Sequence, residues 1–158
     1  MVGYPRNGCY KWDMLLTDLG LIGNCQISAL VSRTGAIVWS CMPRFDSPPI
    51  FASLLDAGTG GEFSISPADG SPGIQRYLPN TNVLETVFES AEGSFRVLDF
   101  APRFTLHARS FRPTKLIRIV EPLSGTPRIR VKCDPVLGWT KGAPGRTFGS
   151  HHIGYLGF

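Results

Sequence analysis

The carboxylates of this chain are the side chains with the clearest capacity for chemistry. Hydrolysis of a glycosidic bond uses two of them, about 5 Å apart in retaining enzymes and roughly 6.5–9.5 Å apart in inverting ones. Twelve Asp and Glu residues are present. Most lie in turns or at alternate positions of predicted strands, as Glu62, Glu85 and Glu89 do, and are expected to be solvated. Asp46 in a proline-rich loop and Asp99 at a strand end are the exceptions.

Asp46 belongs to the loop segment PRFDSP, residues 43–48. Arg44 and Asp46 are two residues apart, so both could face one groove and bind a sugar hydroxyl or a neighbouring domain. An ion pair that only fixes its own loop is the simpler interpretation. Aromatic residues could add platforms for sugar rings, although in β domains they more often pack in cores or interfaces. No residue is predicted to be catalytic, and the candidate interface or cleft residues are Trp39, Arg44, Phe45, Asp46, Ser47 and Trp139.

Sequence signatures of other sites are absent. The chain has no Gly-x-Ser-x-Gly, and its four cysteines include no Cys-x-x-Cys pair of the kind that binds zinc or carries redox chemistry. Cys25 and Cys41 could approach each other across a hairpin, but small buried thiols are the simpler expectation. His151 and His152 are adjacent and would point to opposite faces of a strand. We therefore predict neither a metal site nor a cofactor.

Composition narrows the class of protein. The chain has 158 residues, of which 42% are hydrophobic and 18% charged, as in one globular domain. Its net charge is +4, but Lys and Arg are spread singly, so nucleic-acid binding is not predicted. No apolar run approaches the roughly 20 residues of a membrane helix, and the first residues lack the apolar stretch of a secretory signal. A cytoplasmic location without membrane contact is expected.

Alternating polar and apolar residues predict three pairs of short strands. Residues 26–32 pair with 36–42, residues 82–90 with 94–100, and residues 115–121 with 126–133 around Ser124-Gly125. One short helix is predicted for residues 50–56, a loop for 136–149 and the start of a further strand for 151–158. Short strands joined by Gly and Pro turns indicate an all-β fold, an antiparallel sandwich or barrel with one short helix.

Several blocks of this sequence resemble the trehalase-like N-terminal domain of glycoside hydrolase family 15, the bacterial and archaeal glucoamylases, glucodextranases and trehalases. The most specific blocks are Leu21-Ile22-Gly23, the segment WSCMPRFDSP at 39–48 and the segment YLPNTNVLET at 77–86. The resemblance covers residues 19–158, and residues 1–18 form an atypical N-terminal segment. Asn24 departs from the pattern, because the family usually has Asp there, and Val38 stands where Asp is frequent.

The resemblance implies an antiparallel β-sandwich of the supersandwich kind, followed in the whole enzyme by a catalytic (α/α)6 barrel. That barrel holds both glutamates of an inverting attack on α-linked glucosides, and no residue of this chain corresponds to them. The expected function is therefore that of a non-catalytic domain, apparently cut before the barrel, which braces the barrel and shapes its cleft through residues 43–48. The substrate of the whole enzyme would be an α-glucan or trehalose. The alternative is a stand-alone carbohydrate-binding module that uses Trp39, Phe45 and Trp139.

A domain that packs against a barrel should expose an apolar patch when the barrel is absent. We place this patch around Phe45, Pro48, Phe51 and Trp139, with Arg44 and Asp46 at its rim. The strand expected at 151–158 would add an unprotected edge. The isolated chain is therefore expected to self-associate.

Overall fold

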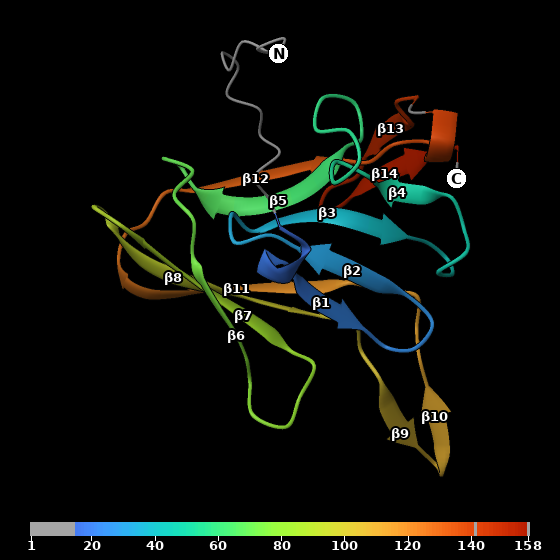
Figure 1. The fold of residues 1–158 in the computed structure, drawn as a ribbon, viewed down its shortest axis with the longest axis horizontal. Coiled ribbons are helices and arrows are strands. Elements are labelled where there is room, and N and C mark those ends of the chain that lie inside the picture. The colour runs from blue at the N-terminus through green and yellow to red at the C-terminus, as the bar shows by residue number, and fades with distance from the viewer. Residues whose placement is uncertain (1–14, 141, 158) are drawn as a thin grey trace, which may run out of the picture.

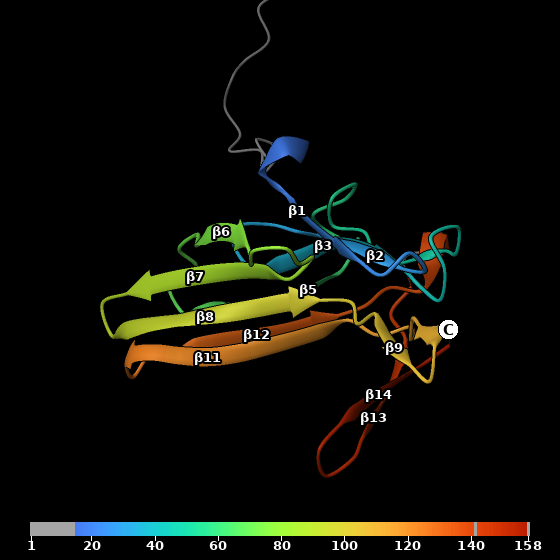
Figure 2. The ribbon, with the colours of Figure 1, turned by 90° about the horizontal axis from the view of Figure 1, so that it is seen from below.

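The computed structural model describes residues 15–140 and 142–157 and shows an all-β fold built from two stacked antiparallel sheets (Figures 1 and 2). The predicted all-β sandwich is confirmed. Within the described residues no helix is long and apolar enough to span a bilayer. The elements in chain order are η1 (Leu16–Asp18), β1 (Gly20–Gly23), β2 (Ser28–Val31), β3 (Ala36–Cys41), β4 (Pro49–Phe51), β5 (Glu62–Pro67), β6 (Ile74–Tyr77), β7 (Leu84–Ser90), β8 (Gly93–Phe100), β9 (Phe104–Leu106), β10 (Arg109–Phe111), β11 (Ile117–Gly125), β12 (Ile129–Asp134), η2 (Gly138–Thr140), β13 (Gly145–Phe148) and β14 (Ile153–Leu156).

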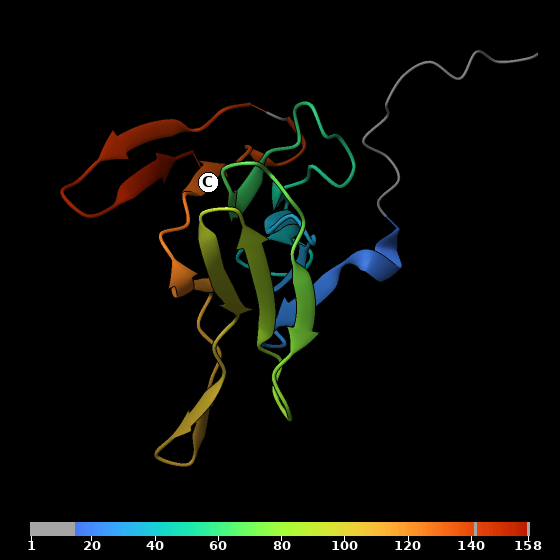
Figure 3. The ribbon, with the colours of Figure 1, turned by 90° about the vertical axis from the view of Figure 1, so that its left-hand side faces the viewer.

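The first sheet has the strand order β1-β2-β3-β5-β12, with β4 paired to β3, and the second has the order β11-β8-β7-β6. Two of the predicted strand pairs are confirmed, since β2 pairs with β3 and β7 pairs with β8. Gly35 closes the first of these hairpins with a positive φ of 76°, a conformation that glycine adopts without strain. Two further hairpins, β9–β10 and β13–β14, project from the sandwich (Figures 1 and 3).

The hydrophobic core lies between the two sheets and follows the alternation of their strands. Leu84, Phe88 and Val97 of the second sheet are buried against apolar residues of the first. The rings of Phe88 and Phe95 stack with their centroids 5.0 Å apart. Leu84, Thr86 and Phe88 are all buried and share one face of β7, as a period of two requires. Residues of the first sheet that belong to these core clusters include Ile22, Ala29, Val31, Ile37, Phe51 and Ile65.

The predicted helix over 50–56 is wrong. Its first residues form β4, which pairs with β3, and turns follow. The backbone N–H of Leu54 donates to Val38 O, and the Asp56 carboxylate accepts the N–H groups of Gly58 and Thr59. Pairing with a neighbouring strand and a carboxylate-stabilised turn therefore outweigh helix propensity in this segment.

The predicted third hairpin is also wrong, although both of its strands exist. β11 pairs with β8 of the second sheet, and β12 pairs with β5 of the first. Gly125 pairs with Gly93 instead of turning back on β11, and a Cβ at position 125 would collide with Glu92 O. The chain then crosses between the sheets through residues 126–128.

The C-terminal part is more ordered than predicted. Residues 136–149 are not simply a loop, because they contain η2 and β13. The further strand predicted within 151–158 is confirmed as β14, which pairs with β13. The atypical segment 1–18 lies largely outside the described residues, apart from the end that forms η1.

Candidate functional site

The proline-rich loop at 43–48 connects β3 to β4 and closes on itself. The backbone N–H of Arg44 donates to Ser47 Oγ at 3.1 Å, and Ser47 N–H donates to Arg44 O at 3.2 Å. The Arg44 guanidinium makes two hydrogen bonds to the Asp46 carboxylate, from Nε at 3.0 Å and from one terminal nitrogen at 2.9 Å. Both side chains are 69% exposed. The ion pair therefore fixes its own loop, as the simpler interpretation expects.

An apolar groove of about 450 Å³ lies beside this loop, between β4 and η2. The backbone N–H of Val136 donates to Ile50 O at 2.9 Å and holds the two segments together. Gly138, with φ of +57°, lies so close to Pro48 that an added Cβ would be 2.7 Å from the proline Cβ. The groove is lined by Met42, Pro43, Ser47, Pro48, Pro49, Ile50, Leu137, Gly138, Trp139, Thr140 and Gly157.

Two tryptophans distant in sequence are in contact beside this groove, and of the two only Trp139 belongs to its lining. The ring centroids of Trp39, on β3, and Trp139, on η2, are 6.1 Å apart and the rings are tilted by 46°. Trp39 is half-buried, whereas Trp139 and Phe45 are exposed. The structure therefore brings Trp39 to Trp139 and joins Arg44, Asp46 and Ser47 in one loop. Phe45 is exposed in that loop but does not line the groove.

The predicted apolar patch needs one correction, because Phe51 is buried. Its side chain belongs to the core between the sheets, where its ring lies 6.3 Å from that of Phe63. Along β4, Pro49 and Phe51 are buried and Ile50 between them is half-buried, and the groove lining includes Pro49 and Ile50 but not Phe51.

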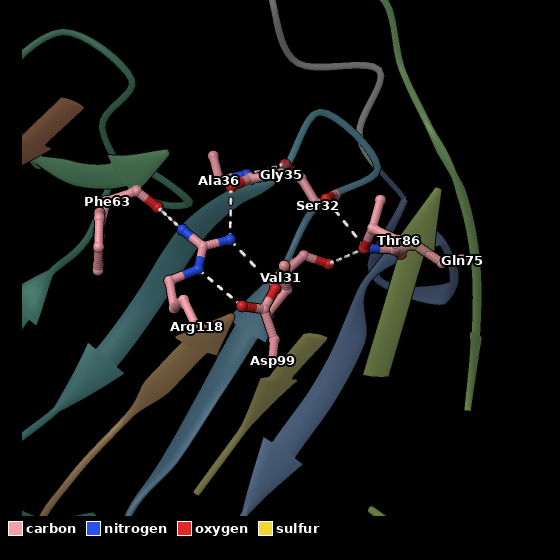
Figure 4. Close-up of polar contacts among 9 residues, drawn as sticks. All are labelled: Val31, Ser32, Gly35, Ala36, Phe63, Gln75, Thr86, Asp99 and Arg118. Atoms are coloured by element: carbon pink, nitrogen blue, oxygen red, sulfur yellow. Dashed lines mark hydrogen bonds and ion pairs between the residues drawn. The ribbon is translucent and has the colours of Figure 1, made fainter. Parts of the chain in front are cut away.

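Asp99, the second carboxylate singled out from the sequence, is an interior residue (Figure 4). It forms a two-pronged ion pair with Arg118 at 2.7 and 3.1 Å, and their side chains are 0% and 2% exposed. The same guanidinium donates to Phe63 O at 2.6 Å and to Gly35 O at 2.7 Å, on the opposite sheet. It also lies 4.8 Å from the Phe63 ring centroid. Asp99 therefore anchors a cross-link between the sheets and does not open onto a cleft.

Glu85 was expected to be a solvated outward residue and is instead buried, with its side chain 1% exposed. It does point away from the core, but Arg76 of β6 and Arg96 of β8 cover it with ion pairs. Arg96 also binds Glu121, which extends the network to β11. The hydrogen bond from Arg76, helped by Arg96, holds the pKa of Glu85 below its usual range despite the opposing effect of burial.

Asp69 and Glu92 are close enough to interact electrostatically, and both are held as carboxylates. Hydrogen bonds from Ser71 lower the pKa of Asp69, and the Arg128 guanidinium lowers the pKa of Glu92. The general acid of a glycoside hydrolase needs the opposite, a pKa raised toward neutrality. This pair therefore lacks the electrostatics of a catalytic dyad.

Sulfur and histidine side chains do not converge. Cys25, Cys41 and Cys133 are free thiols. Cys41 is buried as predicted, whereas Cys25 is exposed, contrary to the prediction. Burial raises the pKa of the Cys41 thiol. His151 and His152 lie in the turn before β14 and not on a strand. In the part of the chain that the structure describes, no three His, Cys, Asp or Glu side chains gather to hold a metal ion.

Residues 14–143 match the family described as Trehalase-like, N-terminal, and that match covers most of the chain. The chain belongs to this family. The resemblance predicted from the sequence is thereby confirmed.

Curated relatives of this trehalase-like N-terminal domain are named trehalases. The chain is 32% identical over 138 residues to the trehalase of Mycolicibacterium smegmatis. This alignment covers 78% of the chain and 20% of the relative. It is 34% identical over 128 residues to the trehalase of Thermoplasma volcanium, and this alignment covers 79% of the chain and 20% of the relative. Trehalase 1 of Sulfolobus acidocaldarius is 45% identical over 87 residues, 55% of the chain and 15% of that protein. The chain thus spans a fifth or less of these relatives, and no solved structure matches it.

Asn24 has a structural role in this trehalase-like N-terminal domain that the sequence did not reveal. The side chain is buried, and its amide nitrogen donates to Pro102 O at 3.1 Å and to Pro113 O at 2.9 Å, at the base of the β9–β10 hairpin. Its amide oxygen accepts the backbone N–H groups of Gln26 and Ile27. An aspartate carboxylate at this position could accept the N–H groups of Gln26 and Ile27, but it could not donate hydrogen bonds to Pro102 O and Pro113 O. Asn24 therefore serves to hold loops together and supplies no charge to a substrate.

Proposed function

We propose that the chain is the non-catalytic N-terminal domain of a trehalase-like glycoside hydrolase. In this proposal it braces the catalytic part of the enzyme through the groove between β4 and η2, and the substrate of the whole enzyme is an α-linked glucoside such as trehalose. The observation that carries the proposal is the family match over residues 14–143, together with the fact that the matched region covers only 20% of these relatives.

The state of the carboxylates supports a non-catalytic role. Of those in the described residues, Asp18, Asp46, Glu62, Glu85, Glu92, Asp99, Glu121 and Asp134 are in ion pairs with Arg or Lys. An arginine partner stabilises the ionised form and thus opposes the role of proton donor. The buried members, Glu85 and Asp99, are enclosed by the side chains that neutralise them and offer no face to a sugar.

The chemistry of the groove supports docking of a protein surface more than binding of a sugar. Its lining consists mainly of Pro, Ile, Leu, Met and Trp, with hydroxyl groups only from Ser47 and Thr140. Sugar sites need several convergent polar groups to pair with hydroxyls, whereas protein interfaces have apolar centres with exposed aromatic anchors. Trp139 is such an anchor, and its proline-rich surroundings lose little conformational entropy on docking.

The first test of this proposal is an assay of the purified chain on trehalose, maltose and dextran. We expect no release of glucose, because the required pair of carboxylates is missing. Glucose release that survives rigorous purification and is abolished by Asp46→Asn would contradict the proposal and identify the loop as an active site.

The second test replaces the matching fifth of the Thermoplasma volcanium trehalase with this chain. We expect the chimera to hydrolyse trehalose, and Trp139→Ala to lower its thermal stability and activity. The matched control is Phe148→Ala, which removes an exposed aromatic ring of β13 that is not part of the groove lining. Equal behaviour of the two variants would contradict docking at the groove. Binding of trehalose or maltose by the isolated chain, lost in Trp139→Ala, would favour the carbohydrate-binding alternative.

A further inference from the structure

The β9–β10 hairpin projects from the sandwich as an arm with two unlike faces (Figures 1 and 3). Paired residues of neighbouring strands point to the same face of a sheet, and so do residues two apart along one strand. One face therefore carries Phe104, Leu106, Arg109 and Phe111, and the other carries Thr105 and Ser110. All residues from 103 to 112 are exposed, so the apolar side chains of the first face are uncovered.

The arm is fixed to the sandwich at its base. The side-chain amide of Asn24 donates to Pro102 O and Pro113 O, which lie on either side of the hairpin. The rings of Phe104 and Phe111 stack with their centroids 5.5 Å apart and an interplanar angle of 16°. A two-stranded hairpin alone is only marginally stable in water, so these contacts give the arm its orientation. An arm held in this way loses little conformational entropy when a partner binds.

A cavity of about 510 Å³ lies at the root of the arm. Its lining includes Val83, Phe100 and Phe104, and Phe104 also belongs to the apolar face of the arm. The cavity and this face therefore form one continuous apolar surface, the arm corner. The aromatic pair lies at the root, whereas the tip consists of His107 and Ala108. A lipid bilayer or a nucleic-acid duplex would meet the tip first, but a protruding segment of a protein can enter the corner.

Positive charge without a partner is concentrated on and beside the arm. The sequence has no acidic residue between Asp99 and Glu121. Among the described residues, the Arg and Lys side chains there that lack a carboxylate partner are Arg103, Arg109, Arg112 and Lys115, and Arg130 on β12 is the only other one. Arg103 donates to Cys25 Sγ at 3.3 Å, and the other three cations of the arm make no side-chain hydrogen bond within the described ranges.

These cations decide between possible occupants of the arm corner. In a symmetric dimer built through the arm, Arg109 and its neighbours would face the same cations of the second copy. A surface that presents carboxylates beside apolar side chains complements the arm instead. The matched region covers only 20% of the trehalases of Mycolicibacterium smegmatis and Thermoplasma volcanium, so most of such a polypeptide lies outside it and can supply this surface.

We infer that the arm corner receives a protruding segment of the catalytic part of a trehalase-like enzyme, with apolar side chains that enter the cavity and carboxylates that pair with Arg103 and Arg109. This contact is separate from the groove between β4 and η2, although both lie at the same end of the sandwich, so that one partner can reach both (Figures 1 and 2). The identity of the partner rests on the proposed function, whereas the uncovered cationic arm does not.

The test compares the isolated chain with the chimera in which this chain replaces the matching fifth of the Thermoplasma volcanium trehalase. Trypsin cleaves after exposed arginines, and Arg109 lies in the hairpin. We expect cleavage after Arg109 to be at least about tenfold slower in the chimera, because the partner must leave before the protease can enter. The backbone amides of β9 and β10 should also exchange hydrogen more slowly in the chimera.

Leu106→Asp and Thr105→Asp form a matched pair, because the two residues are neighbours on β9, are both exposed and lie on opposite faces. Leu106→Asp should restore most of the cleavage after Arg109 in the chimera, since it places a carboxylate against apolar groups of the partner. Thr105→Asp should change the ratio of the chimera rate to the isolated-chain rate less than about twofold. Each isolated variant is the reference for its own chimera, which separates loss of hairpin structure from loss of docking.

Reversal of charge tests the cationic part of the arm. Arg109→Glu should lower the melting temperature of the chimera more than that of the isolated chain, because it opposes carboxylates of the partner. The matched control is Arg130→Glu, which reverses a cation on β12 that also lacks a carboxylate partner among the described residues. We expect this variant to change the two melting temperatures alike.

Four results would overturn the inference. An active chimera whose hairpin is cut as fast as in the isolated chain would leave the proposed function standing and refute docking at the arm. Equal effects of Leu106→Asp and Thr105→Asp would show that the partner does not occupy the corner. Dimers of the isolated chain broken by Leu106→Asp would identify a second copy as the occupant. Binding of anionic lipid vesicles or duplex DNA by the isolated chain, lost in Arg109→Glu, would identify a different class of partner.

Discussion

Two Arg–Asp pairs of this domain have nearly the same local geometry and opposite surroundings. Arg118–Asp99 and Arg44–Asp46 are both two-pronged, with distances between 2.7 and 3.1 Å. The first pair is nearly inaccessible and joins the two sheets through Phe63 O and Gly35 O. The second is exposed and joins residues of a single loop. Both aspartates stand out in the sequence, so residue type and spacing do not distinguish a cross-link from a surface contact.

The cost of desolvation therefore determines how much each ion pair contributes to stability. In the interior, Arg118 must satisfy nearly all its donors within the protein, and it does so with a carboxylate, two carbonyl groups and an aromatic ring. At the surface, water replaces either partner of the Arg44–Asp46 pair at little cost.

The largest effect is expected from Arg118→Ala. It leaves Asp99 as an unpaired buried charge and takes one donor from each of two carbonyl groups, which should lower the free energy of unfolding by about 3–5 kcal/mol. Urea unfolding followed by circular dichroism measures this loss. The double variant Arg118→Leu/Asp99→Leu should recover part of it, because no charge then remains buried; no recovery would mean that the bonds to Gly35 and Phe63 dominate.

Asn24→Asp tests the effect of placing a carboxylate at a buried position where no ion-pair partner is in place. The substitution preserves size, removes the donors to Pro102 O and Pro113 O, and places a carboxylate where Asn24 is 2% exposed. We expect a loss of about 1–3 kcal/mol in the free energy of unfolding, together with faster hydrogen exchange in β9 and β10. An unchanged hairpin would show that backbone pairing alone holds it.

Glu85 lies between the two extremes of the comparison, since it is buried but one partner, Arg76, is 70% exposed. Because the arginines lower its pKa, Glu85 stabilises the fold fully above its ordinary value near 4.5, and this contribution is lost as the pH falls below that value. The free energies of unfolding of the parent and of Glu85→Gln, measured in urea, should therefore differ most near neutral pH. The difference should shrink as the pH falls below about 4.5. A difference independent of pH would assign the effect to shape and not to charge.

The sequence predicts those parts of the fold that depend on neighbouring residues. The β2–β3 and β7–β8 hairpins can be predicted from alternating polar and apolar residues and from the turn residues between them. The family can be predicted from several characteristic sequence blocks that occur in the expected order. The pairing of β11 and β12 could not be predicted in this way, because alternation is the same whichever sheet a strand joins. The burial of Glu85 could not be predicted for a similar reason: the arginines that cover it, Arg76 and Arg96, come from two other strands, β6 and β8.

The candidate site shows the same limit. The loop at 43–48 and its ion pair could be predicted from proline spacing and charge. The meeting of Trp39 and Trp139 was not predictable, since it depends on a hydrogen bond between Val136 and Ile50 and on the close packing of Gly138 against Pro48. Positive φ at Gly138 is a requirement of the fold that composition alone does not express.

The smallest effect is expected from Asp46→Asn, which completes the comparison with Asp99. The pair is exposed and its loop is also held by the Arg44–Ser47 backbone contacts, so the free energy of unfolding should change by less than about 0.5 kcal/mol. High salt should reproduce this small change in the parent, because screening weakens exposed pairs and leaves buried ones nearly intact. The matched control in the chimeric trehalase is Arg33→Gln, which breaks another exposed ion pair, with Asp18. A larger loss of activity or thermal stability in Asp46→Asn than in Arg33→Gln would be a property of the assembled enzyme. That result would assign the loop to the interface or the cleft, whereas equal small effects would restrict docking to the apolar groove beside it.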